Sequence, residues 1–399
     1  MVGSYGEKRV LNIVVIGTGM YATGRGTSGY GTVLPAISEW QRDNDHRSEV
    51  VFVGTNGKHS EASKQKSEQL AIDTGVKLNV SFVPDGNVID RNTYKQVLKE
   101  IPRPACAIVV VPDHLHYQVA SDCIMEDLPL LVVKPLTPTI AEGVELVNLA
   151  DDRSLYGAVE FHKRWDKANL MMRDKIQSGQ LGDLLYCWVE YSQRKSIPTE
   201  IFKEWTEKTS ILQYLGIHYI DIMRFCTGAT PKRVMAVGQK RWLPTQGLNA
   251  YDSIQCIVEW KMKEGYQFTQ TILTNWIDPE TSSAMSDQKI KMVGTKGRFE
   301  SDHKERGIRI NLDNSCVEHP NPDYCMDYMD DGGNKVWKGY GIDSIKTFFS
   351  DVVNINSNKV DVKSLEAVRP TFSEALISTA VVEAAHTSLL NNSEWQDVS

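Results

Sequence analysis

The chain has 399 residues, of which 41% are hydrophobic and 24% are charged. These values are close to those of ordinary globular proteins with two or three domains, and they exclude a disordered, collagen-like or coiled-coil chain. The 44 Lys and Arg residues and the 51 Asp and Glu residues give a net charge of −7. Because the basic residues form no stripe, the charge pattern also argues against a nucleic-acid-binding protein.

The first part of the chain alternates between strand and helix patterns. Residues 11–16 are nearly all aliphatic, which is typical of a strand buried on both faces of a parallel sheet. A glycine-rich loop and a helical pattern over residues 33–40 lead to a second strand at 50–53. The pattern continues with helices at 94–101, 116–127 and 140–151 and strands at 105–111, 129–133 and 155–160. It predicts a doubly wound α/β domain with a parallel sheet over residues 1–158.

The second part of the chain has strands in succession. Helices are expected at 165–178 and 210–226, followed by strands at 234–240, 253–260, 266–273, 289–293 and 298–301. Apolar residues alternate along 254–260, which favours an antiparallel sheet with one wetter face. Residues 159–399 are therefore expected to form an α/β domain with a large, open, mainly antiparallel sheet and a terminal helix at 371–390. The acidic, tyrosine-rich stretch 314–338 is expected to be an irregular insertion.

The cysteines and the N-terminus bear on the compartment. The seven cysteines are widely spaced and include no CxxC pair, as in reduced cytoplasmic proteins. The first residues show no apolar run of the signal-peptide kind, and no stretch of 18 apolar residues occurs. We therefore expect a cytoplasmic protein without a membrane span.

The glycine-rich loop follows the first strand directly. Gly17-Thr-Gly19-Met20-Tyr21-Ala22 matches GxGxx[GA], in which glycines make the turn and admit a pyrophosphate to backbone amides. The pattern predicts dinucleotide binding by Gly17, Gly19, Met20 and Tyr21, with 24–29 as an elongation of the same loop. The alternative is a merely flexible loop.

The end of the second strand bears on the choice of dinucleotide. Rossmann domains specific for NAD usually place a carboxylate there for the ribose 2′-hydroxyl. Residues 53–60 instead contain small polar and basic groups, among them Thr55, Asn56, Lys58 and His59. NADP is therefore at least as likely a cofactor as NAD, unless this segment is an ordinary polar turn.

Two further patterns suggest catalytic groups. Lys134 closes an apolar strand at the carboxyl edge of the sheet, where open α/β sheets bind ligands. Tyr214, His218 and Asp221 follow i, i+4, i+7 on the helix expected at 210–226. The alternatives are a solvated lysine and a buried, hydrogen-bonded polar stripe. Gly216, in the same helix, suits a position that something must approach closely.

In order and spacing, these motifs and several others resemble the Gfo/Idh/MocA oxidoreductases over nearly the whole chain. The further motifs are Pro112–His116, Glu160–Asp166, Gly216–Asp221 and Gly294–Gly297. Val133-Lys134-Pro135 stands where the family has Glu-Lys-Pro. The resemblance implies an N-terminal Rossmann domain and a C-terminal sheet often used for oligomerisation, here as a homodimer or homotetramer. It also implies hydride exchange between a nicotinamide and a secondary alcohol of a sugar or polyol.

The resemblance also implies roles for individual residues. Lys134 and His218 match family catalytic positions, and Tyr214 stands where many members have Asp; Tyr214 or His218 would exchange the proton. Pro112, His114 and His116 would lie at the cofactor, together with Lys134. The substrate would contact His162, Arg164 and Trp165 beside the catalytic groups.

Other functions remain open at this point. A tightly held cofactor would also serve a redox-neutral sugar epimerase or lyase, and a few relatives are non-catalytic dinucleotide-binding regulators. His114 and His116 lack a third ligand in the sequence, so no metal is expected, and we expect no nucleic-acid or membrane partner.

Overall fold

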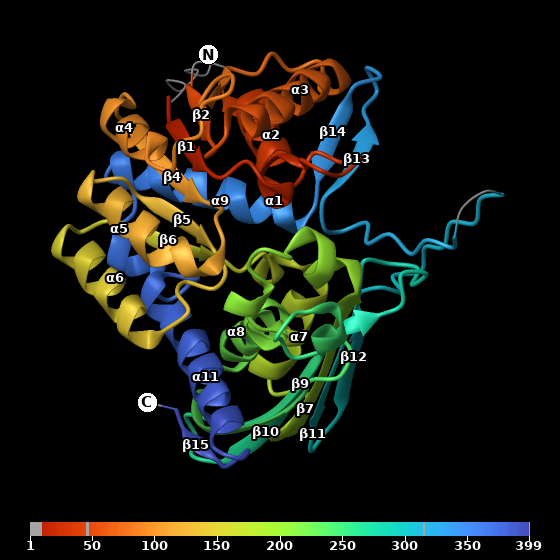
Figure 1. Ribbon diagram of the computed structural model, residues 1–399. Helices are drawn as coiled ribbons and strands as arrows, with labels where there is room; N and C mark the ends of the chain where they lie inside the picture. Colours follow the sequence, from red (N-terminus) through yellow and green to blue (C-terminus); the bar gives the residue numbers. More distant parts are fainter. Residues whose placement is uncertain (1–9, 45–47, 314–315, 399) are drawn as a thin grey trace. The chain divides into compact units, whose positions relative to one another are not determined.

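The computed structural model describes residues 10–44, 48–313 and 316–398. The chain divides into two compact units (Figure 1). The first is built from residues up to Val133, Val144–His162 and Asp323–Glu374; the second contains Lys134–Gly143, Lys163–Pro322 and the segment from Ala375 onward. This division differs from the single boundary expected at residue 158, because a late segment of the chain returns to the first unit.

The first unit is a doubly wound α/β domain. Its six-stranded sheet has the order β3-β2-β1-β4-β5-β6, and all neighbouring strands are parallel. The order reverses between β1 and β4, which creates the switch point where open sheets bind ligands. The strands are β1 (Asn12–Ile16), β2 (Val50–Val53), β3 (Val80–Val83), β4 (Ala105–Val109), β5 (Leu130–Val133) and β6 (Gly157–Glu160).

The helices of this unit follow the order expected for crossover connections. The sequence prediction did not include α3, β3, α9 or α10, and the elements that it did place here are confirmed within a few residues. The helices are α1 (Met20–Thr23), α2 (Val33–Asn44), α3 (Gly57–Thr74), α4 (Thr93–Glu100), α5 (His116–Met125), α6 (Ile140–Asp152), α9 (Tyr340–Asn356) and α10 (Val362–Leu365).

Helix α9 is a late segment that completes the core of the first unit. It packs against α2, where the rings of Trp40 and Phe349 lie 5.3 Å apart. The rings of Tyr156 and Phe348 stack at 5.7 Å. The expected irregular insertion at 314–338 is only partly irregular, because β13 (Met326–Met329) and β14 (Lys335–Lys338) form an antiparallel hairpin.

The second unit is built on a mixed, mainly antiparallel sheet with the order β12-β11-β7-β10-β9-β8-β15. Only the β7 and β10 pair is parallel among its described pairings. Residues on β9 alternate between buried and half-buried, as expected for a sheet with one face on the core. The strands are β7 (Leu184–Arg194), β8 (Thr230–Gln239), β9 (Ser253–Lys261), β10 (Gln267–Asp278), β11 (Ser286–Gly294), β12 (Arg298–Asp302) and β15 (Gln396–Asp397).

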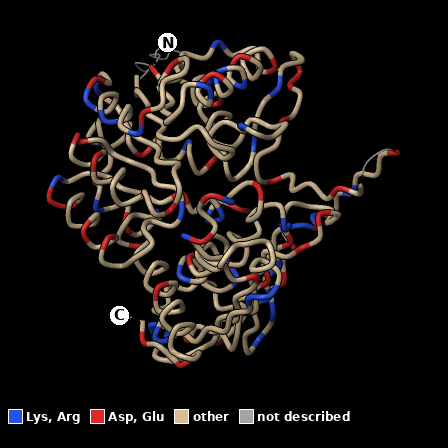
Figure 2. The backbone as a smooth tube through the Cα atoms, in the orientation of Figure 1, with Lys and Arg blue, Asp and Glu red and all other residues tan. Residues whose placement is uncertain are grey.

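Helices cover the core face of this sheet. Helix α7 (Lys167–Gln177) packs on α8 (Ile217–Thr227), and the turn that precedes α8 contacts β10. The chain ends in α11 (Phe372–Leu390) before β15. In the described ranges, no helix combines the length and the apolar character that crossing a membrane requires. Acidic and basic residues are interspersed along the backbone of both units (Figure 2).

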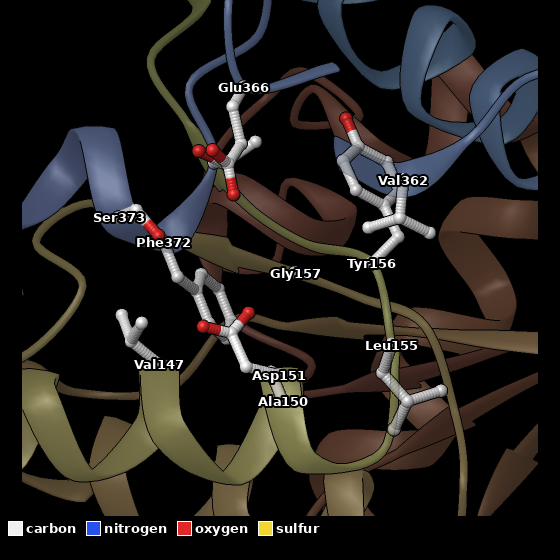
Figure 3. A pocket seen from close by; sticks show the side chains of 11 residues that line it. Val147, Ala150, Asp151, Leu155, Tyr156, Gly157, Val362, Glu366, Phe372 and Ser373 are labelled. Atoms are coloured by element: carbon white, nitrogen blue, oxygen red, sulfur yellow. The ribbon is translucent and has the colours of Figure 1, made fainter. Parts of the chain in front are cut away.

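A pocket of the first unit lies away from the switch point. It is lined by residues at the start of β6, the end of α6 and the segment 371–373, and Asp151, Glu366 and Phe372 are among the side chains that line it (Figure 3). Gly157 makes room for the ring of Phe372, since a Cβ there would come within 2.5 Å of it. Ligands of open α/β sheets bind at the carboxyl ends of the strands, so this pocket at an amino end is not the candidate active site.

Candidate active site

Gly17 lies where the carboxyl ends of three strands meet. Its amide donates to the carbonyl of Val53 at the end of β2, at 2.8 Å. Its φ is +121°, and a Cβ at this position would lie 2.0 Å from the carbonyl oxygen of Val110, just beyond β4. Only glycine combines this φ with this close approach. The first glycine of the motif is thus required by the turn itself.

Gly19 has the opposite surroundings. A Cβ added there would meet no atom within 4 Å, and helix α1 begins directly after Gly19. Backbone amides at such an opening suit the oxygens of a pyrophosphate. The loop therefore fits the dinucleotide that the sequence motif predicts.

Tyr21 does not present its side chain in the way expected for a cofactor-binding residue. Its ring stacks on His162 at 6.5 Å, and its hydroxyl is buried. Burial, reinforced by the carboxylate of Glu160, raises the pKa of this phenol well above its ordinary value. Tyr21 and Met20 are both half-buried, and the motif predicts that a cofactor would meet the backbone amides of this loop.

His162 is part of the same aromatic cluster. Its ring lies 5.3 Å from Tyr324 and 5.6 Å from Tyr340, and its Nδ1 lies 2.8 Å from a carboxylate oxygen of Glu160. His162 belongs to the first unit, while Arg164 and Trp165 belong to the second. The three residues expected to line one substrate site are thus divided between the two units.

The end of β2 is polar. Thr55, Lys58 and His59 are exposed. The side-chain oxygen of Asn56 accepts the amide of Lys58 at 3.0 Å and caps α3, so this side chain has a structural role that the sequence prediction did not include. A carboxylate is absent from positions 54–60.

The loop between β4 and α5 contains the two predicted histidines in different surroundings. His116 is fully buried, and its Nε2 lies 2.9 Å from the carbonyl oxygen of Val111. Its side chain therefore fixes the loop beside the predicted cofactor site, and its place at the cofactor stays a prediction. His114 is exposed and Pro112 is half-buried, so both remain candidates. Among the described residues, no group of three metal-ligating side chains occurs.

The second unit brings Lys134 and Tyr214 together. The Nζ of Lys134 lies 3.5 Å from the centroid of the Tyr214 ring and donates a hydrogen bond to the backbone carbonyl of the same residue. Phe202 and Trp276 pack around this ring at 4.7 and 6.2 Å. Lys134 and Tyr214 are 80 positions apart in the sequence and form a cation–π pair in the structure.

Tyr214 and His218 lie on two kinds of helical turn. The sequence predicts one α-helix over 210–226, but Leu212–Gly216 forms a π-helical turn before α8 begins at Ile217. At Gly216, a Cβ would come within 2.6 Å of Leu212, and within 3.4 Å of Thr274 on β10. This confirms the close approach expected at that glycine. The helix positions the buried His218 one turn after Tyr214.

Asp221 and Arg164 form a buried ion pair. Arg164 Nε and Nη2 lie 2.9 and 2.6 Å from the two carboxylate oxygens of Asp221, and the side chains are 6% and 1% exposed. The structure pairs the guanidinium of Arg164 with this carboxylate, so the expected contact of Arg164 with a substrate stays a prediction that the pair does not favour. Trp165 is half-buried and remains a candidate.

A buried polar network beside these groups was not predicted. Lys163 lies between the rings of Tyr191 and Tyr219, 5.4 and 5.3 Å from their centroids, and donates to the side chain of Gln288. Burial lowers the pKa of Lys163 to about 7; Asp166 opposes this shift, and the charges of Arg306 and Lys134 add to it.

Asp166 anchors the rest of this network. Its carboxylate lies 2.6 Å from Nη2 of Arg306 and 3.1 Å from Nδ1 of His303. Burial alone would raise the pKa of Asp166, but hydrogen bonds from these two residues outweigh it and hold the pKa below its usual range. Burial lowers the pKa of His303 to about 4. The sequence signal for Lys163 and Asp166 was their place in the segment 160–166, but nothing marked the distant His303 and Arg306.

Comparison with protein families identifies both halves of the chain. Residues 11–161 match a model described as an oxidoreductase family with an NAD-binding Rossmann fold. Residues 169–300 match the model of the GFO/IDH/MocA C-terminal domain.

Characterised relatives match only part of the chain. The scyllo-inositol 2-dehydrogenase (NADP(+)) IolW of Bacillus subtilis is 32% identical over 160 residues, which are 38% of this chain and 42% of that protein. Inositol 2-dehydrogenase 1 of Saccharopolyspora erythraea is 32% identical over 32% of this chain and 36% of its own length. The chain therefore spans about a third to two fifths of the length of these relatives.

Solved structures share the fold over the whole chain. Myo-inositol 2-dehydrogenase of Lactobacillus plantarum superposes with a TM-score of 0.68 at 14% identity, covering 98% of this chain and 100% of that chain. Scyllo-inositol dehydrogenase of Lactobacillus casei, solved with NAD(H) and scyllo-inositol, gives a TM-score of 0.66 at 14% identity, with 98% and 99% covered. At this identity the similarity establishes the architecture of both units.

Proposed function

The chain belongs to the Gfo/Idh/MocA oxidoreductase family, and we propose that it is an NAD(P)-dependent sugar or polyol dehydrogenase. It transfers a hydride between a nicotinamide and a secondary hydroxyl or ketone of a sugar, sugar acid or nucleotide sugar. The observation that carries this proposal is the ammonium of Lys134 held 3.5 Å from the ring centroid of Tyr214, with His218 one turn further along. The inositol dehydrogenases among the relatives support the substrate class.

The chemistry requires a base for the hydroxyl proton, and a bound nicotinamide supplies the hydride acceptor. Lys134 hydrogen-bonds the reacting hydroxyl, and its positive charge favours the alkoxide that forms as the proton leaves. Tyr214 or His218 takes that proton. Burial of His218 and the aromatic residues around Tyr214 keep water from competing. Trp165 and His162 are the remaining proposed substrate contacts.

Both nicotinamide dinucleotides suit the glycine loop, and the end of β2 favours NADP. Positions 54–60 offer no carboxylate for a ribose 2′-hydroxyl. Thr55 and Asn56 lie there, and Gly17, Gly19 and Met20 contact the dinucleotide on the glycine-loop side. Pro112, His114 and Lys134 are the other residues proposed to contact the dinucleotide.

The proposal extends to assembly and location. The outer face of the large sheet carries half-buried Trp188 and Leu273, and a second copy of the chain would cover them in a homodimer or homotetramer. The cysteines of the described segments are free thiols, which suits the reducing cytoplasm.

One experiment tests the function directly. The purified protein is denatured, any released nucleotide is identified by mass spectrometry, and absorbance at 340 nm is followed with sugars, inositols, sugar acids and nucleotide sugars. A change at 340 nm that needs both dinucleotide and substrate supports the dehydrogenase. Retained nucleotide with turnover that needs none added would instead identify a redox-neutral epimerase or lyase. Dinucleotide binding with no turnover of any kind would favour a regulator.

A further inference from the structure

The glycine loop has an extension, residues 24–31, that folds back on itself. Gly24 and Gly31 both have left-handed backbone, with φ of +72° and +71°. A Cβ on Gly24 would lie 2.1 Å from the carbonyl oxygen of Gly29. The chain closes where the amide of Thr32 donates to the carbonyl of Tyr21 at 2.8 Å. The extension is therefore a compact loop inserted between α1 and α2.

Side chains from helix α3 hold this loop in place. Lys66 Nζ donates to the carbonyl of Thr27 at 2.7 Å. The hydroxyl of Tyr30 donates to a carboxylate oxygen of Asp73 at 2.8 Å. The loop thus lies along the helix that follows β2, and its residues have defined positions next to the dinucleotide-binding motif.

Arg25 is the cation that this loop supplies. Its Nε donates to the carbonyl of Thr18, between the two motif glycines, at 2.8 Å. The same carbonyl lies 3.3 Å from the hydroxyls of both Thr23 and Ser63. Among the described residues, no carboxylate pairs with Arg25, and its two terminal nitrogens make no hydrogen bond. One nitrogen of the half-buried guanidinium is anchored and two remain as donors.

Thr18, whose carbonyl anchors Arg25, has its side chain against the end of β2. A Cβ on Gly54, the residue after β2, would lie 2.9 Å from the hydroxyl oxygen of Thr18. The end of β2 is where Rossmann domains distinguish a ribose 2′-hydroxyl from a 2′-phosphate, the latter often through an arginine. Arg25 is therefore linked through Thr18 to the end of β2. This is the position where the chain has no carboxylate for a ribose 2′-hydroxyl.

We propose that Arg25 is a specificity-determining residue that binds the 2′-phosphate of NADP. A guanidinium anchored through Nε presents its other two nitrogens to a phosphomonoester, and arginine recognises this group with paired, charge-assisted hydrogen bonds. The proposal rests on the proposed function, because it assumes that a dinucleotide occupies the glycine loop. It adds the residue that selects the phosphorylated ribose.

The test measures binding without turnover. Dissociation constants for NADPH, NADH and 2′,5′-ADP are determined by calorimetry for the wild type, Arg25→Ala and Arg25→Lys. Arg25→Ala is expected to weaken NADPH and 2′,5′-ADP about 10- to 100-fold and to change NADH by less than about 3-fold. Arg25→Lys retains a point charge and is expected to recover part of the loss.

The matched control is Arg153→Ala. Arg153 belongs to the same unit and lies in the turn between α6 and β6. Its guanidinium pairs with Asp127 at 2.6 Å. The Arg153→Ala variant removes the same charge as Arg25→Ala and is expected to leave all three dissociation constants unchanged. Circular dichroism and thermal unfolding confirm that each variant is folded.

Several results would overturn the proposal. Equal losses for NADH and NADPH in Arg25→Ala would assign Arg25 to the pyrophosphate, and unchanged constants would leave it no part in binding. A wild type that binds NADH but neither NADPH nor 2′,5′-ADP would exclude a 2′-phosphate site, while the dehydrogenase proposal would stand. A wild type that binds no dinucleotide would overturn both proposals.

Discussion

Lys134 lies over the face of Tyr214, with Nζ 3.5 Å from the ring centroid, and also donates to the backbone carbonyl of Tyr214. Both contacts are made with one residue, so the position of the ammonium depends on the backbone of the π-helical turn. The contacts do not require the tyrosine hydroxyl. The hydroxyl can therefore be removed without displacing the lysine, and the two groups can be tested separately.

Lys134→Met is expected to lower kcat/KM about 100- to 10,000-fold, because the reacting hydroxyl loses its charged hydrogen-bond donor. Steady-state rates at 340 nm measure this loss. The apolar side chain keeps similar volume, so the thermal unfolding midpoint is expected to change little. Activity near that of the wild type in a folded variant would remove Lys134 from the reaction.

Tyr214→Phe and His218→Asn separate the two candidates for proton exchange. The residue that exchanges the proton is expected to lose about 100- to 10,000-fold in kcat on substitution, and the corresponding limb of the pH profile is expected to disappear. The other variant keeps that limb. If both variants keep both the rate and the profile, neither residue is the base.

Gly17 and Gly19 provide a matched pair for the cofactor site. Gly17→Ala is expected to destabilise the first unit by more than about 1 kcal/mol, since its Cβ would lie 2.0 Å from a backbone oxygen at a φ of +121°. Gly19 has an extended backbone with a φ of −82°, and the methyl group of Gly19→Ala would meet no protein atom within 4 Å.

The Gly19 variant is therefore expected to keep its unfolding midpoint and to bind dinucleotide at least about 10-fold more weakly, because the methyl group occupies the space at the phosphate loop. Chemical unfolding and fluorescence titration with NADPH check the two effects. Unchanged affinity in Gly19→Ala would place the dinucleotide elsewhere.

Local patterns predicted the doubly wound sheet well. Buried strands such as β1 and β4 are continuous apolar runs, which directly report burial on both faces. Helix α9 was not predicted, although Ile342, Ile345 and Phe349 repeat at helical spacing and mark it. Its packing in the first unit could not be predicted, because it follows the second unit in the sequence. Its place depends on a long-range contact with α2 that local periodicity does not encode.

The candidate site was predictable by residue type more than by side-chain direction. Lys134 and Tyr214 were both expected in the site, and the structure brings them together. Arg164 and His116 were expected in the site from motifs of the family resemblance, but both side chains are buried with protein partners. The partner of Arg164 is 57 positions away, so the sequence could not show that its charge was already neutralised.

The buried pair of Arg164 and Asp221 gives a prediction for stability. Arg164→Met or Asp221→Leu alone is expected to cost about 3 to 5 kcal/mol in the free energy of unfolding, because each leaves an uncompensated buried charge. The double variant is expected to be more stable than either single variant. Urea unfolding of the four proteins completes the cycle.

The exposed pair of Arg298 and Glu300, with side chains 67% and 51% exposed, is the control for this cycle and is expected to contribute less than about 1 kcal/mol. Similar costs for the buried and exposed pairs would show that burial does not control the penalty.

Lys163 gives a prediction for the dependence of stability on pH. Its pKa of about 7 in the folded protein lies below its ordinary value of 10.5. Between these two values, the unfolded chain binds a proton that the folded chain does not, so the free energy of unfolding rises with pH. The contribution is at most about 1.4 kcal/mol per pH unit. It is complete above the ordinary pKa and is lost as the pH falls through about 7.

Lys163→Met removes this titration while filling the same space between Tyr191 and Tyr219. The difference in unfolding free energy between wild type and variant is therefore expected to shift in favour of the wild type from pH 7 to pH 10. Guanidinium unfolding at pH steps within this range measures the difference, and groups common to both proteins cancel. The charges of Arg306 and Lys134 disfavour the protonated lysine, and the charge of Asp166 favours it. A flat difference would mean that Asp166, with the hydrogen bond to Gln288, keeps Lys163 charged throughout the range.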